Sequence, residues 1–300
     1  MKSVIRSAFV AAAAATAVLA FADPAPPVKK LALPGAPASG GVALDFVAAD
    51  RGRHRVWVPA GGTGSVDVLD TTTDTFTRVE GFPTTEVEVR GTQRVMGPSS
   101  VTLSDGRAFI GNRADNSVCV VVLGVSPAGA LAVAGTIPLE GEPEGYAVDE
   151  NRGLFYTNLE DADRTLAIDV PTRKVVATWK PECGAGGPKG LVIDTASDVL
   201  VVACPDHVVA LDAGHGGQRL GEAKVGAGID NIDYVPARHE VFVAAGRDAT
   251  LAIFQLSAKG GLEPVATERT TEGARTVVAD GDGTAYVIDP REGGILVVRR

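Results

Sequence analysis

The 300-residue sequence predicts an all-β fold, a β-propeller of six four-stranded blades. Short runs of β-branched and aliphatic residues recur along the chain, and clusters of Gly, Asp, Asn and Pro separate them. No uninterrupted stretch of ordinary helix length carries the 3.6-residue period of a helix. The composition, 45% hydrophobic and 22% charged, is that of a folded protein rather than a disordered one.

Residues 1–22 have the pattern of a cleavable signal peptide. Lys2 and Arg6 form a positive start, Ala8–Ala20 is apolar, and an Ala-Phe-Ala tripeptide ending at Ala22 suits a signal peptidase. The expected mature chain begins at Asp23, is periplasmic or secreted, and has no further apolar run long enough to span a membrane. Without the two basic residues the charge is 26 minus 37, or −11, which disfavours a nucleic-acid partner.

The repeat occupies residues 41–300 and is clearest in one strand of each unit. The strand's anchor residues are separated by 52, 48, 42, 43 and 44 positions, and they are Val66, Val118, Leu166, Val208, Leu251 and Ile295. A period in the forties with several short strands per unit is typical of propeller blades. Because the first spacing is the longest, a seven-bladed ring is the alternative. The extra residues around Val87 to Arg94 are too few for a blade, so we expect them to form an excursion over one face.

The Pro-rich segment 23–40 contains one short apolar piece, residues 28–33. The sixth unit ends after three strands because the sequence stops at Arg300. We therefore expect residues 28–33 to supply the missing strand and close the ring, which removes two open sheet edges.

Aspartates recur at two positions of the repeat, at the ends of the first and third strands of the units. An Asp side chain accepts backbone N–H bonds in a tight turn, so we assign these residues to turn capping. They are Asp50, Asp149, Asp194 and Asp280 in the first set, and Asp70, Asp169 and Asp212 in the second.

Three segments resemble the YVTN-type repeats of secreted YncE-like propellers: GSVDVLDTTTDTFTRVEGF, EPEGYAVDENRGLFYTNLEDADRTLAIDVPTRKVVATW and DNIDYVPARHEVFVAA. The resemblance extends from about Gly41 to Val298 and implies a periplasmic propeller. One branch of that family is associated with single-stranded DNA, an association that the charge of −11 opposes.

A second resemblance is to the gluconolactonase-like six-bladed propellers, which hold calcium at the mouth of the central channel with Glu, Asn and Asp. In a propeller the starts of the first strands meet at one end of the channel. Of the residues there, Glu144, Asp230 and Asn231 match that metal set in type, and calcium prefers such oxygen ligands. The whole candidate ligand-binding set at the mouth is Asp45, Ser99, Glu144, Lys189, Asp230, Asn231 and Arg275.

The alternative interpretation of the mouth is an ion-pair ring, in which Glu144 and Asp230 pair with Lys189 and Arg275. Cysteine placement favours a disulfide between Cys183 and Cys204, which strand pairing returns to the same face, with two free thiols as the alternative. No nucleophile elbow, phosphate loop or zinc-ligand spacing is present in the sequence.

Two functional hypotheses follow. The first is a non-enzymatic module that binds a protein, small molecule or glycan on one face. The second is a calcium-dependent hydrolase of lactones or esters, in which Glu144 and Asp230 bind the metal and Asp45 or Asp230 acts as the base. A third possibility beside these two is a protein with a purely structural role in the cell envelope.

Overall fold

The computed structural model describes residues 28–37, 41–89, 91–104, 107–115, 117–122, 139–141 and 143–299. The expected signal peptide, residues 1–22, lies outside this range, as do residues 23–27 and 38–40 of the Pro-rich segment. In the described ranges no helix has the length and apolar character needed to cross a membrane.

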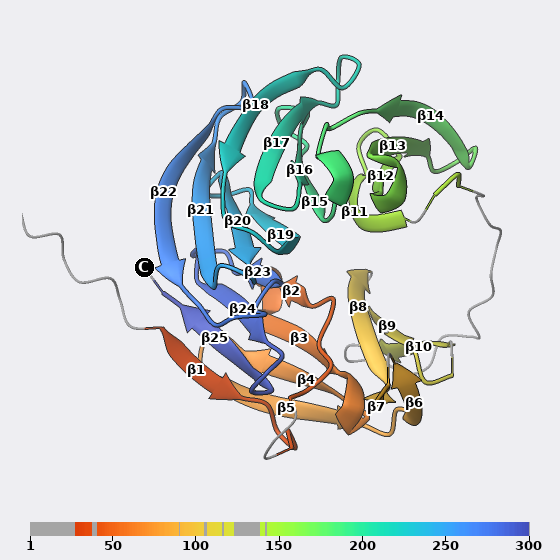
Figure 1. Ribbon diagram of the computed structural model, residues 1–300, viewed down its shortest axis with the longest axis vertical. Helices are drawn as coiled ribbons and strands as arrows, with labels where there is room; N and C mark the ends of the chain where they lie inside the picture. The colour runs from red at the N-terminus through yellow and green to blue at the C-terminus, as the bar shows by residue number, and fades with distance from the viewer. Residues whose placement is uncertain are drawn as a thin grey trace, which may run out of the picture.

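The chain is built almost entirely from antiparallel sheets. Six of them stand around a common axis, with the first strand of each nearest the axis and the last strand at the periphery (Figure 1). Alternating β-branched and aliphatic residues explain this extended structure, because such side chains pack well on a pleated surface.

The first three sheets are formed by residues 48–179. Their strands are β2 (Ala48–Asp50), β3 (Arg55–Ala60), β4 (Ser65–Asp70) and β5 (Thr75–Glu80); β8 (Pro98–Ser104), β9 (Arg107–Asn112) and β10 (Ser117–Val122); and β11 (Pro143–Asp149), β12 (Leu154–Leu159), β13 (Arg164–Asp169) and β14 (Lys174–Trp179). Short 3-10 helices at strand ends are η1 (Arg51–Arg53), η2 (Gly61–Thr63) and η3 (Glu160–Ala162).

The other three sheets follow the same plan. Their strands are β15 (Leu191–Asp194), β16 (Val199–Ala203), β17 (His207–Asp212) and β18 (Arg219–Lys224); β19 (Ile229–Val235), β20 (Glu240–Ala245), β21 (Thr250–Leu256) and β22 (Leu262–Arg269); and β23 (Val277–Ala279), β24 (Ala285–Asp289), β25 (Gly294–Val298) and β1 (Lys29–Ala32). The 3-10 helix η4 (Gly184–Gly186) precedes β15.

The N-terminal strand completes the last sheet. β1 pairs antiparallel with β25, from Lys29 opposite Val297 to Ala32 opposite Gly294. Leu33, which follows β1, is only 3% exposed and packs in the core between this sheet and the β2 sheet. The expected closing strand is therefore confirmed, and it joins the two ends of the described chain.

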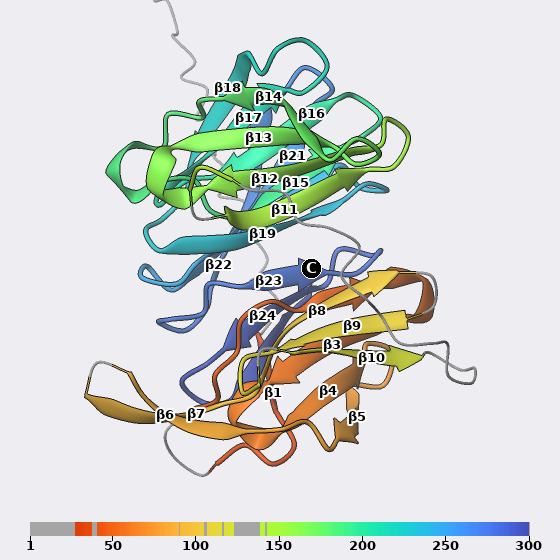
Figure 2. The ribbon, with the colours of Figure 1, turned by 90° about the vertical axis from the view of Figure 1, so that its right-hand side faces the viewer.

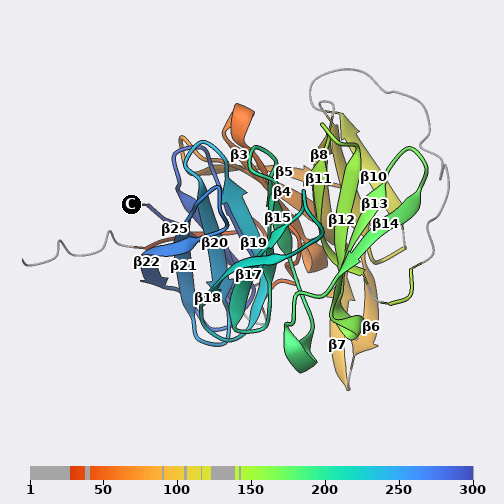
Figure 3. The same cartoon turned by 90° about the horizontal axis from the view of Figure 1, so that it is seen from above.

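The excursion expected around residues 87–94 is a β-hairpin. β6 (Thr85–Val89) and β7 (Thr92–Met96) form a two-stranded sheet of their own. The hairpin projects away from the six sheets (Figures 2 and 3). It is too small to be a blade.

The hydrophobic core lies between neighbouring sheets. Val56 and Val58 of β3, for example, pack with Tyr286 and Ile288 of β24 and with Ile295 of β25, and all are buried. The outermost strands alternate between exposed and half-buried residues, as β18 does, because only one of their faces meets a neighbour. The apolar side chains are thus buried between neighbouring sheets, and the first strands lie nearest the axis.

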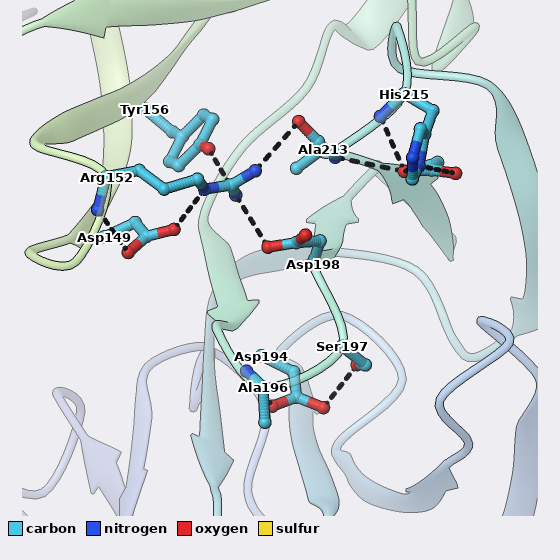
Figure 4. Close-up of polar contacts among 11 residues, drawn as sticks. Asp149, Arg152, Tyr156, Asp194, Ala196, Ser197, Asp198, Ala213 and His215 are labelled. Carbon is cyan, nitrogen blue, oxygen red and sulfur yellow. Dashed lines mark hydrogen bonds and ion pairs between the residues drawn. The ribbon is translucent and has the colours of Figure 1, made fainter.

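The recurrent aspartates cap turns. Asp149 accepts the Arg152 N–H at 3.2 Å and the Arg152 Nε–H at 2.5 Å, and Arg152 also contacts Asp198 and the Tyr156 hydroxyl (Figure 4). Asp194 repeats the pattern one sheet further on by accepting the Ala196 N–H. The same capping role falls to Asp50, Asp70, Asp169, Asp212 and Asp280.

The packing between the β8 and β11 sheets differs from the rest of the ring. Tyr146 and Val148 of β11 are each 46% exposed, whereas the first strands β15 and β23 are mostly buried. Among the described residues of these two sheets, the Tyr146 hydroxyl donates to Thr102 Oγ1 at 3.1 Å.

Candidate functional site

The seven residues expected at the channel mouth lie at the starts of first strands or just before them. Ser99 is in β8, Glu144 in β11, and Asp230 and Asn231 in β19. Asp45, Lys189 and Arg275 lie shortly before β2, β15 and β23. We call the face where these strands begin the mouth-side face.

Backbone hydrogen bonds between consecutive sheets bring these strand starts together. The Gly190 N–H donates to the Asp230 carbonyl at 2.7 Å, and the Asn231 N–H donates to the Arg275 carbonyl at 3.3 Å. The Phe46 N–H donates to the Ser99 carbonyl at 3.1 Å. These backbone hydrogen bonds, and not side-chain contacts, therefore make residues that are far apart in sequence neighbours at the mouth.

A glycine makes one of these close approaches possible. Gly145 has a φ of +65°, and a Cβ added there would lie 2.7 Å from the Lys189 carbonyl oxygen. A register shift between Glu144 and Tyr146 accompanies it in the β11–β12 ladder. A bulge of this kind re-aims the neighbouring side chain, here Glu144.

The charged side chains at the mouth form specific pairs. Arg275 Nε lies 3.0 Å from Asp230 Oδ2, as the ion-pair interpretation expected. Lys189 contacts Glu160 of η3 and is 4.0 Å from Glu144 Oε2, so its main partner is a residue that the mouth set did not include.

Asp45 also has a partner from outside the predicted set. Arg113, which follows β9, donates to Asp45 Oδ2 at 2.7 Å. Ser99 directs its hydroxyl to the Gly111 carbonyl at 3.5 Å, and Asn231 lines the channel below.

Glu144 is the carboxyl without a close cation of its own. Burial raises its pKa from 4.5 to about 7, and a hydrogen bond with the Asp230 carboxyl adds to the rise, while Lys189 and Arg275 oppose it. Burial also raises the pKa of Asp45, although Arg113 opposes that shift. The pKa of the Glu144 carboxyl is therefore raised above its ordinary value mainly by burial, with the neighbouring Asp230 carboxylate adding to the rise.

The calcium set predicted from the sequence includes this pair. In the described part of the chain, no group of three or more His, Cys, Asp or Glu residues is arranged to hold a metal ion. Calcium takes six to eight oxygen ligands, and Asp230 is engaged by Arg275. Metal binding would therefore require Arg275, and with it Lys189 beside Glu144, to move away.

The central channel below the mouth is narrow. It contains a cavity of about 190 Å³ that first-strand residues line, among them Phe46, Ile232 and Val278. Arg51 lies among the lining residues and donates to Asp233 at 2.6 Å and to the Ala279 carbonyl at 3.0 Å.

A larger cleft of about 900 Å³ opens beside the mouth on the same face. The hairpin strand β7 borders it, together with the loop before β2, η2 and the strand starts that carry Ser99 and Arg275. We call this space the hairpin cleft. Its charged lining residues are Asp45, Arg94, Arg113 and Arg275.

Cys183 and Cys204 are joined in a disulfide, with their Cα atoms 5.0 Å apart. Cys204 follows β16, and Cys183 begins the loop that leads to Lys189. Beyond the disulfide, this loop is held by the Lys189 N–H, which donates to the Ala203 carbonyl at 2.8 Å.

Sequence reasoning missed Arg94 as a site residue. Glu160 and Arg113 follow second strands of their units, and the repeat is the signal that places them in turn-rich loops on the mouth-side face. Their pairing with Lys189 and Asp45 was not predicted. Arg94 lies in the irregular excursion, outside the repeat, where no such signal exists.

No family model matches the chain, and no curated protein does either. Solved structures do match. A chain of a mitotic checkpoint complex has a TM-score of 0.62 with 15% identity, over 95% of this chain and 99% of that one. The β-propeller domain of Cps50 (Swd1) from Myceliophteria thermophila has a TM-score of 0.59 with 11% identity, over 90% and 99%.

Hydrazine synthase of Kuenenia stuttgartiensis gives a TM-score of 0.57 with 11% identity, over 89% of this chain and 99% of that one. Identities this low show a shared fold and nothing about activity. The chain therefore has a β-propeller fold.

Proposed function

We propose that this chain is a secreted, six-bladed propeller of the YncE-like kind that binds a partner on its mouth-side face without catalysing a reaction. The six sheets around the axis, with β1 completing the last, support the blade number. The apolar run before Ala22 supports secretion. The mouth-side face is where a propeller's variable loops build specific surfaces.

The hairpin cleft carries this proposal. A two-stranded hairpin is at best marginally stable by itself, and it adds nothing to the ring of blades. In this chain it projects from the mouth-side face and borders a cleft of about 900 Å³. A cleft of that size is large enough for a ligand or for a segment of a partner protein.

Excision of the hairpin tests the proposal directly. The Thr84 methyl group would lie 3.3 Å from a Cβ on Gly97, so the two ends of the excised segment are adjacent and a Gly-Gly linker can replace residues 85–96. The mature protein, the excised variant and Arg55→Gln are immobilised and exposed to crosslinked cell-envelope extracts. Arg55 is exposed at the start of β3, on the opposite face, and serves as the matched control.

A partner retained by the mature protein and by Arg55→Gln, but lost on excision, supports the proposal. The same retained proteins with all three baits would contradict it. Equal thermal midpoints for the three proteins establish that the excised variant is folded.

A second candidate function is the calcium-dependent hydrolysis of lactones or esters. One feature favours it: burial raises the pKa of Glu144 to about 7, near the pH at which a general acid or base is most effective. Lactone hydrolysis that depends on calcium and is lost in Glu144→Gln would support this function in place of the first.

A further inference from the structure

The hairpin cleft runs along a strand of the hairpin. Four consecutive residues of β7, Gln93–Met96, line it, so β7 forms one wall of the cleft.

In the described part of the chain no strand lies against the outer edge of β7, although η2 lies beside the end of β7, where a Cβ on Gly62 would be 3.4 Å from the Val95 carbonyl oxygen. β7 pairs with β6 alone, from Thr85 opposite Met96 to Val89 opposite Thr92. In a two-stranded antiparallel ladder, half of the N–H and C=O groups of each strand point away from the partner strand. Such an edge can accept an extended peptide as a further strand.

The cleft floor is formed before any ligand binds. The Gly61 N–H donates to the Ala43 carbonyl at 3.1 Å. A Cβ on Gly97 would lie 2.0 Å from the Gly61 carbonyl oxygen, and one on Gly41 would lie 2.2 Å from the Pro290 carbonyl oxygen. At these two positions the backbones approach so closely that only glycine fits.

The charges of the cleft favour an anion. Three of its four charged lining residues are arginines, in a chain whose net charge is −9. Arg113 is paired with Asp45, and Arg275 with Asp230. Arg94 is exposed, and within the described ranges no carboxylate holds it.

We propose that the hairpin cleft binds an extended, acidic segment of a partner protein, which adds to the edge of β7 as a strand and places a carboxylate on Arg94. Backbone hydrogen bonds to the edge supply affinity, and the Arg94 guanidinium supplies selectivity for Asp or Glu. Val95 and Met96 offer apolar contacts beside it. This inference rests on the proposed binding function and names the chemistry of the partner.

A displayed library of random peptides tests the inference. Peptides are selected on the mature protein and counter-selected on the hairpin-excised variant. We expect the enriched peptides to carry more Asp and Glu than the library. Enrichment without acidic residues, or the same peptides on both proteins, would overturn the proposal.

Two substitutions then test the role of Arg94 with an enriched peptide. We expect Arg94→Glu to weaken binding by about tenfold or more, and a peptide with Lys in place of its acidic residue to restore it. Arg55→Glu makes the same change of charge on the opposite face and should leave binding unchanged. Equal affinities for the Arg94 and Arg55 variants would refute the assigned contact.

A chemical change to the peptide tests the strand pairing. N-methylation of alternate amides in the register that faces β7 should abolish binding, while methylation in the other register should not. Equal binding of both methylated peptides would overturn the strand-addition geometry. If no peptide is enriched but a hairpin-dependent partner is captured from envelope extracts, this inference fails and the proposed function stands.

Discussion

Removal of the Cys183–Cys204 disulfide should destabilise the propeller by an amount that the length of the closed loop sets. The two cysteines are 21 positions apart in sequence. The chain-entropy relation for a loop of that length gives about 3 kcal/mol, because the crosslink restricts the unfolded chain. For a domain of this size the thermal midpoint should fall by roughly 5 °C.

The assay is thermal unfolding of three samples followed by circular dichroism. They are the mature protein without reductant, the same protein with reductant, and the double variant Cys183→Ala/Cys204→Ala. We expect the last two to unfold at similar temperatures, and the double variant to be insensitive to reductant. Because both cysteines are buried, the Ala variant also loses a little packing, which the reduced wild type does not.

A midpoint that reductant lowers by less than about 2 °C would refute the loop-entropy reasoning. A large fall in the double variant alone would show that the lost sulfur atoms, and not the crosslink, determine stability. Cys119→Ala serves as a control, since it removes a thiol that takes no part in this disulfide.

Four further outcomes are expected. Leu33→Ala should cost about 2 to 5 kcal/mol in urea unfolding, because Leu33 anchors the closing strand in the core, whereas the exposed Val265→Ala should cost little. Glu144 has a folded pKa of about 7, above its ordinary 4.5, so the folded protein keeps a proton that the unfolded chain releases. Stability from this group is lost as pH rises through about 5 to 7, and Glu144→Gln should flatten that part of the pH profile; parallel profiles would contradict the assignment. Under the binding function, calcium added after EDTA should leave the thermal midpoint unchanged; a rise of about 5 to 10 °C that Glu144→Gln abolishes would instead support the hydrolase. Mass spectrometry of the exported protein should find a mature chain beginning at Asp23, and retention of residues 1–22 would contradict the signal peptide.

The sequence by itself predicted the propeller, the closing strand and the turn caps. Each of these depends on local pattern: the alternation around anchors such as Val66 and Leu166 defines strands, and Asp149 caps a turn through its own neighbouring backbone. A repeated local pattern also brings the strand starts to one face, so the location of the mouth residues followed from the repeat.

Only the tertiary structure decided which charges pair and where the hairpin lies. Lys189 lies closer to Glu160 than to Glu144, and Asp45 contacts Arg113, because the approach of separate sheets sets these distances. The repeat gives no register for the hairpin, so it could not show that Arg94 borders a cleft with Arg275, nearly two hundred residues away in sequence. Strand formation depends on nearby residues, whereas ion pairs and clefts depend on contacts between distant ones.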